Sequence, residues 1–287
     1  MKKKVIAIQG AQGSNHHKVA LDFYGDDIQL KECMSFDVLV DSLIDQSADL
    51  GIMALENTIA GSIIPNYALI DKNNLHITGE EYLNIHHHLM ALKGQKIEDI
   101  KEVWSHPMAL LQCKEFFKKH PYIKLVEDVD TAEVAKRISQ KNLVGIAAIA
   151  PKIAAEIFDL DIVEDEIQTI KDNSTRFVLV QTTPPNNGID QINKASLKFQ
   201  LDHKRGSLAT ILNVLSDCKM NLTKIQSLPV IETPWKYSFF VDVTFDEYKD
   251  YKKAESIIEI MAEEFKILGT YKNGRRKPNA ELVSASK

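Results

Sequence analysis

Cysteine is scarce in this chain of 287 residues, and the three that occur, Cys33, Cys113 and Cys218, lie far apart. Their odd number and the lack of a Cys-x-x-Cys pair argue against a disulfide framework and against a zinc site of the usual spacing. This cysteine usage fits a reducing compartment, so we expect a cytoplasmic protein. The basic start MKKK is like that of a signal peptide, but the apolar stretch behind it breaks at Gln9 and is too short for one.

An excess of positive charge and long apolar runs are also missing. The formal net charge is -5 and the pI is near 6.0, so there is no basic excess to hold nucleic acid or an anionic membrane. No apolar run approaches the length that spans a bilayer. With 44% hydrophobic and 26% charged residues, the chain is globular and long enough for two domains. We therefore expect a small-molecule partner, with neither nucleic acid nor membrane involved.

Short apolar runs alternate with helical stretches up to about residue 168, which is the pattern of an α/β fold. Strands are expected at VIAIQG, ADLGIMAL and EVWSHP, and helices near residues 16–24 and through MALLQCKEFFKK. Asp130 is placed to cap a further helix with Glu133 at its third position, and another helix begins at Pro151.

The polar segment QTTPPNNGIDQINK ends this pattern, because its prolines exclude regular helix and its turn formers bury nothing. We place the boundary there, with residues 1–183 as the first domain and 184–193 as a linker. The second domain, residues 194–273, has the order βαββαβ of a ferredoxin-like unit, and residues 274–287 are expected to be a disordered tail. The expected elements are strand 195–203, helix 207–218, strands 221–228 and 236–245, helix 250–265 and strand 266–272.

Polar residues gather at four junctions between predicted strands and helices, where open α/β sheets bind ligands. The junctions are GAQGSNH, ENTIAGS, SHP and the NSTR that precedes FVLV. They supply an amide, hydroxyls, an imidazole and a guanidinium that suit carboxylate or hydroxyl oxygens. Taken singly, each junction also has a purely structural explanation as a turn or a helix cap. The candidate residues are Asn57, Thr58, Ser62, Ser105, His106, Ser174, Thr175 and Arg176.

Dinucleotide and metal sites are not indicated. Gly10 and Gly13 lack the third glycine of GxGxxG, and no acidic residue follows at the distance needed for a ribose. On a strand, His86 and His88 would face one side and His87 the other, with no third ligand at a useful spacing. No GxSxG, P-loop or HExxH motif occurs.

Taken in order, the junctions resemble the motifs of the prephenate dehydratase family, and the resemblance covers nearly the whole chain. Gly10, Gly13 and Ser14 loosely match a GPxGTFS-like loop, and ALENTIAGS resembles PIENSxxGS. NIHHHL is similar to a strand that bears a histidine, with His87 in register, and SHPMALLQC to SHPQALxQC. NSTRFVLV, which includes Phe177, resembles the NxTRF motif.

The resemblance implies a two-lobed catalytic domain like a type II periplasmic binding protein, with a cleft between the lobes. It implies conversion of prephenate to phenylpyruvate, water and CO2 in L-phenylalanine biosynthesis, without a cofactor or metal. Thr175 would hydrogen-bond the departing hydroxyl, and Arg176 would hold a carboxylate through its planar donor fork. Glu56 and His106 are candidate proton sources, and the sequence does not choose between them. The substrate contacts implied are Asn57, Thr58, Ser62, Ser105, His106, Ser174 and Phe177.

The ferredoxin-like part would then be an ACT domain, which senses amino acids, and L-phenylalanine would inhibit through it. Gln226 and Leu228 stand where the family has glutamate and arginine, so we expect weakened coupling to the catalytic lobes. A homodimer or homotetramer is also implied. Two alternatives stay open: an arogenate dehydratase, and a non-catalytic amino-acid-sensing binding protein, against which the intact NSTRF stretch argues. The implied effector residues are Gly206, Ser207, Leu208, Ala209, Asn221 and Leu222.

Overall fold

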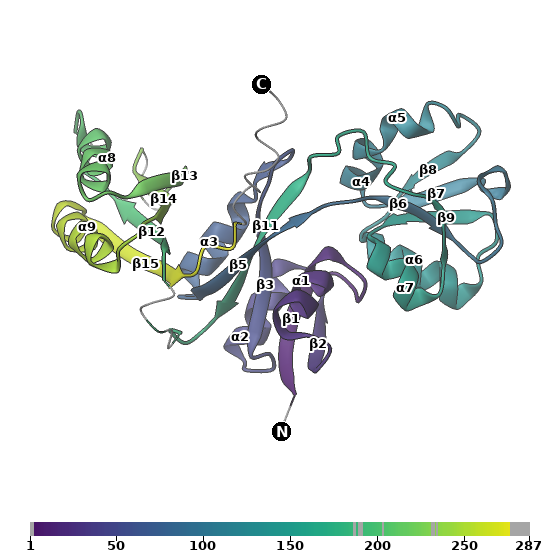
Figure 1. Ribbon diagram of the computed structural model, residues 1–287, viewed down its shortest axis with the longest axis horizontal. Coiled ribbons are helices and arrows are strands. Elements are labelled where there is room, and N and C mark those ends of the chain that lie inside the picture. Colours follow the sequence, from purple (N-terminus) through teal and green to yellow (C-terminus); the bar gives the residue numbers. More distant parts are fainter. Residues whose placement is uncertain are drawn as a thin grey trace. The chain divides into compact units, whose positions relative to one another are not determined.

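The computed structural model describes residues 3–185, 188, 192–202, 204–230, 233 and 235–275 (Figure 1). Half of the predicted linker, residues 186, 187 and 189–191, and the predicted tail from residue 276 on lie outside the described residues. Contacts divide the chain into a first unit, residues 1–66 and 83–177, and a second unit, residues 67–82 and 178 onward. The second unit therefore includes a segment from the N-terminal part of the chain. The functional boundary at residues 184–193 stays a prediction.

The first sheet has the strand order β2-β1-β3-β11-β5, with β4 paired to β3. β1 is parallel to both β2 and β3, so these strands end at the same edge. Helix α1 begins after Ser14, whose side chain accepts the N–H of His17, and α2 begins after Ser35, which accepts that of Val38. The elements are β1 Lys4–Gln9, α1 Asn15–Tyr24, β2 Ile28–Cys33, α2 Phe36–Ile44, β3 Leu50–Asn57, β4 Gly61–Ser62, α3 Ile64–Lys72, β5 His76–Asn84 and β11 Ser174–Gln181.

The second sheet has the order β10-β6-β9-β7-β8, in which β7 is parallel to β8 and β9. Asp130 caps α6 as predicted, accepting the N–H of Ala132 and of Glu133, and α7 begins directly after Pro151. The helix predicted through MALLQCKEFFKK is wrong, because two short helices meet at Cys113. The elements are β6 His88–Ala91, η1 Ile97–Asp99, β7 Glu102–Ser105, α4 Pro107–Gln112, α5 Lys114–Phe117, β8 Lys124–Glu127, α6 Thr131–Lys141, β9 Ile146–Ala150, α7 Lys152–Phe158 and β10 Asp161–Glu164.

The predicted ferredoxin-like unit is confirmed as a four-stranded antiparallel sheet of order β13-β14-β12-β15 with two helices. Apolar residues of β12 and β14 pack with Ile211 and Leu215 of α8 and with Tyr251 and Ile258 of α9. The predicted helix 250–265 was too long, since α9 ends at Met261 and the last strand starts at Glu264. The elements are β12 Lys194–Gln200, α8 Ser207–Asp217, β13 Asn221–Pro229, β14 Tyr237–Thr244, α9 Tyr248–Met261 and β15 Glu264–Tyr271.

The polar face of β12 is buried as completely as its apolar face. Glu80 of β5 accepts two hydrogen bonds from Lys194 Nζ, at 2.9 and 2.7 Å, and the side chains are 0% and 2% exposed. Lys198 Nζ lies 2.7 Å from Asp71. The segment 67–82 therefore contributes carboxylates that neutralise the lysines of β12 within the second unit.

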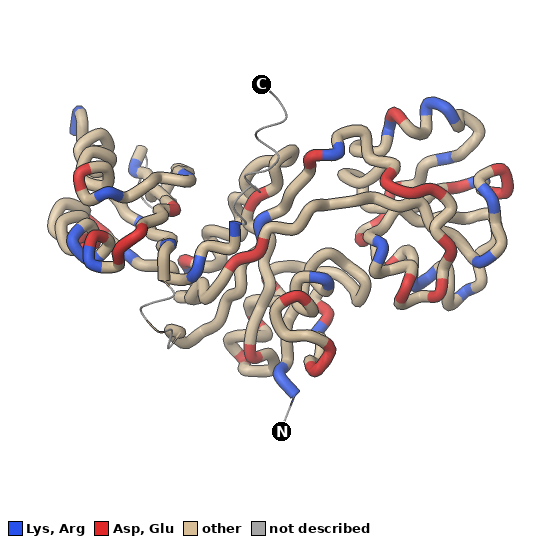
Figure 2. The backbone as a smooth tube through the Cα atoms, viewed as in Figure 1, with Lys and Arg blue, Asp and Glu red and all other residues tan. Residues whose placement is uncertain are grey.

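Charge is mixed elsewhere along the chain. Figure 2 shows lysine and arginine interspersed with aspartate and glutamate in both the strands and the helices. Among the described residues, no helix is long and apolar enough to cross a membrane.

Glu80→Gln should destabilise the second unit by about 3 kcal/mol, because it removes the carboxylate that is bonded to the buried Lys194 ammonium. Urea denaturation followed by circular dichroism measures this. Glu115→Gln is the control, because its ion pair with Lys118 is more than half exposed and should contribute less than about 0.5 kcal/mol. Equal midpoints for the two variants would contradict the role given to the buried pair.

Candidate functional site

Three of the four predicted junctions lie at the carboxyl ends of β1, β3 and β7, and the fourth, NSTR, lies at the amino end of β11. β1 and β3 end before Gly10 and at Asn57, while β7 and β9 end at Ser105 and Ala150. Loops from the two edges touch, because a Cβ on Gly13 would lie 3.1 Å from Ala154 Cα of α7. The edges at which α/β sheets bind ligands are thus joined.

Asp130 makes the second contact between these edges. A Cβ on Gly10 would lie 2.5 Å from Asp130 Oδ2, and Gly10 has a φ of 89°, so only glycine fits there. Burial raises the pKa of the Asp130 carboxyl, while the N–H groups of Glu133, Ala132 and Ala11 act in the opposite direction. Gly10 thus lets the backbone come close to a carboxyl group, and that group belongs to a side chain of the protein.

Asn57, at the end of β3, has a fixed amide orientation. Its Oδ1 accepts the backbone N–H of Ile59 at 2.9 Å and that of Ala60 at 2.8 Å, and only an oxygen can accept both. Its Nδ2 therefore faces the other way, where it donates to Asn173 Oδ1 at 2.6 Å and to Thr175 Oγ1 at 2.9 Å. Backbone groups of the ENTIAGS loop thus set the direction of the hydrogen bonds around Thr175.

The same direction continues through Asn173, which is 1% exposed. Because Asn173 Oδ1 is an acceptor, its Nδ2 is the donor to Gln112 Oε1, at 3.1 Å. Gln112 Oε1 also lies 2.7 Å from Nε2 of His87. We call Thr175, Asn57, Asn173, Gln112 and His87 the polar network.

Within the part of the chain that the structure describes, two hydrogen-bond donors of the polar network have no acceptor. The Thr175 hydroxyl accepts from Asn57, and its own proton meets no acceptor. The Gln112 Nε2 group likewise has no partner, and Gln112 is partly exposed. A bound molecule with oxygen atoms could accept hydrogen bonds from both groups.

The other predicted residues near NSTR fall into two groups. Thr58 and Ser174 hold the loop to β11, since Thr58 Oγ1 accepts the N–H of Ser174 at 2.9 Å and Thr58 N–H donates to the Ser174 carbonyl. Phe177 is a core residue, with His16 edge-on to its ring at 4.9 Å. Burial lowers the pKa of His16 to about 3, so this imidazole is neutral.

Arg176 is 2% exposed and leaves β11 on the face opposite to Thr175, because successive strand residues alternate. Ser62 lies on β4, opposite Glu56 of β3. The contacts of Arg176, Ser62 and Glu56 with a substrate stay predictions.

The SHP junction serves local structure. Ser105 is fully buried and its hydroxyl donates to the Ile149 carbonyl at 2.8 Å. His106 is exposed and caps α4, where its Nδ1 accepts the N–H of Met108 at 3.2 Å. In the structure Ser105 therefore bonds the neighbouring strand and His106 serves as a helix cap, as the structural explanation of this junction had it.

Four residues of the region were not among the predicted site residues, and one of them, His87, was noted only for its register in NIHHHL. Asn173 and Gln112 join the polar network only through contacts between distant segments, although both stand in the quoted stretches NSTRFVLV and SHPMALLQC. Asp130 was identified as a helix cap alone.

The three histidines of NIHHHL belong to different settings. His86 lies 3.1 Å from Glu166 and His88 2.5 Å from Asp165, while His87 belongs to the polar network. The described residues contain no group of three or more potential ligands placed to hold a metal.

Comparison with known proteins identifies the family. The sequence model of the family "Prephenate dehydratase" matches residues 6–185. A curated relative, arogenate dehydratase/prephenate dehydratase 2 of Arabidopsis thaliana, is 34% identical over 93% of this chain and 72% of its own length. The chain belongs to the prephenate dehydratase family.

Two solved structures share its fold. Prephenate dehydratase of Arthrobacter aurescens, in complex with L-Phe, has a TM-score of 0.82 with 23% identity and covers 98% of this chain and 96% of its own. GqqA, described as a quorum-quenching acylase, also has a TM-score of 0.82, with 24% identity over 96% of this chain and all of its own. At these identities the likeness concerns the fold alone, so the chemistry must be argued from the site.

Asn57→Asp should lower turnover on the order of 10²-fold. The introduced carboxylate would accept a hydrogen bond from the Thr175 hydroxyl, whose proton is not engaged by Asn57 in the unchanged protein. The change keeps the shape of the side chain and its acceptor for the Ile59 and Ala60 N–H groups. Steady-state kinetics and a thermal unfolding control measure it. Turnover within about threefold of the unchanged protein would show that the direction of this hydrogen bond does not matter.

Proposed function

We propose that this protein is a prephenate dehydratase, which converts prephenate to phenylpyruvate, water and CO2. The observation that carries the proposal is the Thr175 hydroxyl, which accepts a hydrogen bond from Asn57 and keeps its own proton for a bound molecule. The family match over residues 6–185, which include the whole polar network, supports it.

The reaction needs help for a poor leaving group. The bond between the ring and its carboxylate breaks, the electron pair enters the ring, and the ring hydroxyl on the opposite carbon leaves with its bonding pair. One proton converts the departing hydroxide to water, and aromatisation supplies the driving force. A donor aimed at the leaving oxygen stabilises the charge that develops there.

Thr175 provides that donor. A threonine hydroxyl is too weak an acid to give up its proton unaided near neutral pH, so we assign it hydrogen-bond stabilisation and relay of a proton from water. Gln112 Nε2, the second donor without an acceptor, is suited to a substrate carboxylate. The carboxylate contact predicted for Arg176 stays a separate proposal, because Arg176 leaves β11 on the face opposite to Thr175. Glu56, His106 and the buried Asp130 are the ionisable groups from which the proton would come.

The same geometry argues against acyl transfer by Thr175. A nucleophilic hydroxyl needs a base that accepts its proton, and the neighbour of Thr175 Oγ1 is a donor, Asn57 Nδ2.

The alternative of a non-catalytic binding protein is tested by activity. Purified protein should form phenylpyruvate from prephenate, and no product above the uncatalysed rate would refute the proposed function. Arogenate, assayed in parallel, tests the other alternative.

Thr175→Val should lower turnover about 10² to 10⁴-fold while prephenate affinity and folding are kept, because it removes the hydroxyl and preserves the shape. Steady-state kinetics on phenylpyruvate formation measures it, with Thr58→Val as the control, since Thr58 Oγ1 bonds the backbone of Ser174 instead. A Thr175→Val turnover within about threefold of the unchanged protein would remove Thr175 from its assigned role.

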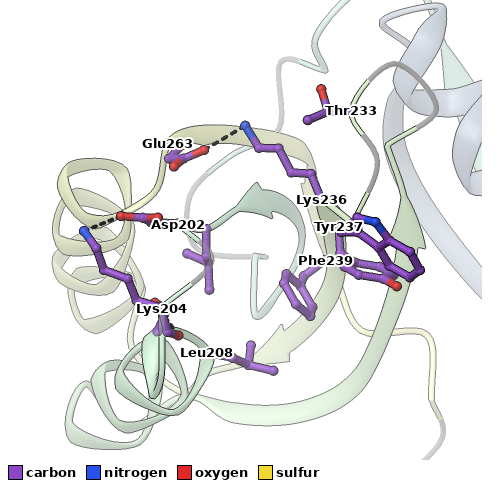
Figure 3. Close-up of a pocket in the computed structure, with 11 residues that line it drawn as sticks. Asp202, Lys204, Leu208, Thr233, Lys236, Tyr237, Phe239 and Glu263 are labelled. Carbon is purple, nitrogen blue, oxygen red and sulfur yellow. Dashed lines mark hydrogen bonds and ion pairs between the residues drawn. The ribbon is translucent and has the colours of Figure 1, made fainter.

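The second part of the proposal is inhibition by L-phenylalanine through the ferredoxin-like unit as an ACT domain. A pocket of about 450 Å³ lies at the N-terminus of α8 (Figure 3). Its apolar lining includes Leu208, Tyr237 and Phe239, and its charged lining includes the pairs Lys204 with Asp202 and Lys236 with Glu263. An aromatic amino acid presents the matching set of groups: a ring, a carboxylate and an ammonium.

The predicted effector residues divide between two places. Ser207 and Leu208 line this pocket, next to Gly206, which caps α8 with a φ of 85°, and Ala209 follows in the helix. Asn221 and Leu222 begin β13, beyond the other end of the 11-residue helix α8, which is roughly 16 Å long. In the proposal Asn221 and Leu222 would come from a second copy in a homodimer or homotetramer.

The proposal also keeps the cytoplasmic location that the cysteine usage suggested.

Ser207→Asp should weaken L-phenylalanine binding at least about tenfold, because a carboxylate in the first turn of α8 occupies the place of the effector carboxylate. The same change favours the helix, so folding should be kept. Calorimetric titration measures the affinity, and Asn213→Asp, exposed on the same helix outside the pocket, is the charge-matched control. Unchanged binding to Ser207→Asp would exclude this pocket as the effector site.

A further inference from the structure

The proton positions in the polar network follow from two backbone N–H groups. Because Ile59 and Ala60 donate to Asn57 Oδ1, Asn57 Nδ2 donates to Asn173 Oδ1, and Asn173 Nδ2 donates to Gln112 Oε1. The atom of Gln112 that faces His87 is therefore an oxygen. His87 Nε2, 2.7 Å away, must carry a hydrogen.

We infer that His87 is a positioning residue of the dehydratase, held as the Nε2–H tautomer, whose N–H orients the Gln112 amide so that Gln112 Nε2 is presented to the substrate. This inference rests on the proposed function. His87 does not touch the reacting atoms in this account. It acts through Gln112, whose Oε1 it shares with Asn173.

The surroundings of His87 favour a neutral ring. The residue is 6% exposed, and its Nδ1 has no hydrogen-bond partner among the described residues, so a second ring proton would be buried without an acceptor. Burial lowers the pKa of His87, the hydrogen bond with Gln112 opposes this, and His88 and His86 lower it further. The carboxylates of Asp165 and Glu166 pair with His88 and His86 instead of His87.

The backbone holds His87 independently of its ring. Its N–H donates to Gln168 Oε1 at 2.9 Å, and its carbonyl accepts the N–H of Ile167 at 2.8 Å. A change of side chain at residue 87 should therefore leave this crossing of segments in place. Its effect should be confined to Gln112, whose Oε1 then accepts only from the side-chain Nδ2 group of Asn173.

The kinetic test compares His87→Leu with His87→Gln. Leucine removes the donor, so KM for prephenate should rise about tenfold with turnover changed less than about threefold, as for loss of a contact made equally in ground and transition states. A glutamine amide can place an N–H near the position of the ring Nε2, so His87→Gln should restore KM to within about threefold. His120→Leu, a histidine whose ring contacts Phe116 and Tyr122 outside the polar network, is the control and should leave KM unchanged.

Equal losses in the leucine and glutamine variants, or no loss in either, would overturn the positioning role. The tautomer is measured separately, by ¹⁵N NMR of the histidine rings in the whole unchanged protein, with His87→Leu used for assignment. We expect Nε2 of His87 to be protonated and Nδ1 to be bare near neutral pH. Protonation at Nδ1 would overturn the inference even if the kinetics agreed. Because this spectrum needs no substrate, it separates failure of the inference from failure of the proposed function, which the prephenate assay of the unchanged protein reveals.

Discussion

The two hydrogen bonds from the Ile59 and Ala60 N–H groups to Asn57 Oδ1 decide the chemistry of the site. They turn the Asn57 Nδ2 group toward Thr175 and Asn173, and every later hydrogen bond in the polar network takes its direction from that choice. A threonine next to a donor is itself left as a donor. A backbone turn after β3 therefore makes Thr175 fit to stabilise a leaving hydroxide rather than to act as a nucleophile.

The network needs the two sheets of the first unit to be held together, and contacts at their carboxyl edges do so. Asp130 of the second sheet lies against Gly10 of the first, and Gly13 lies against α7. A Cβ would lie 2.5 Å from Asp130 at Gly10 and 3.1 Å from Ala154 at Gly13, and both glycines have a positive φ that other residues rarely adopt. The glycines of the GAQGSNH loop are thus explained by packing, without any bound phosphate.

Much of the fold follows from the sequence, because strand and helix periodicity and helix caps are local properties. The βαββαβ order and the cap at Asp130 were predicted on that basis. The burial of the polar face of β12 was not, because the pattern KASLKFQ is that of a strand with one exposed face. Its lysines are neutralised by Glu80 and Asp71, more than 100 residues away in sequence, and no local pattern shows such a pairing.

The site was predicted in part for a similar reason. Thr175 and Asn57, both named from their motifs, are hydrogen-bonded to each other. Ser105 and Phe177, also named from those motifs, instead contact the rest of the fold, since the Ser105 hydroxyl donates to the Ile149 carbonyl and the Phe177 ring packs against His16. Gln112 and Asn173 were missed as site residues because their role depends on the direction of hydrogen bonds between segments. That direction is set by a backbone turn at residues 57–60 and is visible only in three dimensions.

The central claim is that Thr175 donates its proton to the leaving oxygen while it accepts from Asn57. The most direct measurement is a crystal structure with a ring-saturated analogue of prephenate, which keeps the hydroxyl and both carboxylates but cannot aromatise. The account predicts that the analogue's ring hydroxyl oxygen lies within about 3 Å of Thr175 Oγ1, with the Asn57 contact preserved. A ring hydroxyl bound by other groups, with Thr175 out of hydrogen-bond reach, would contradict it.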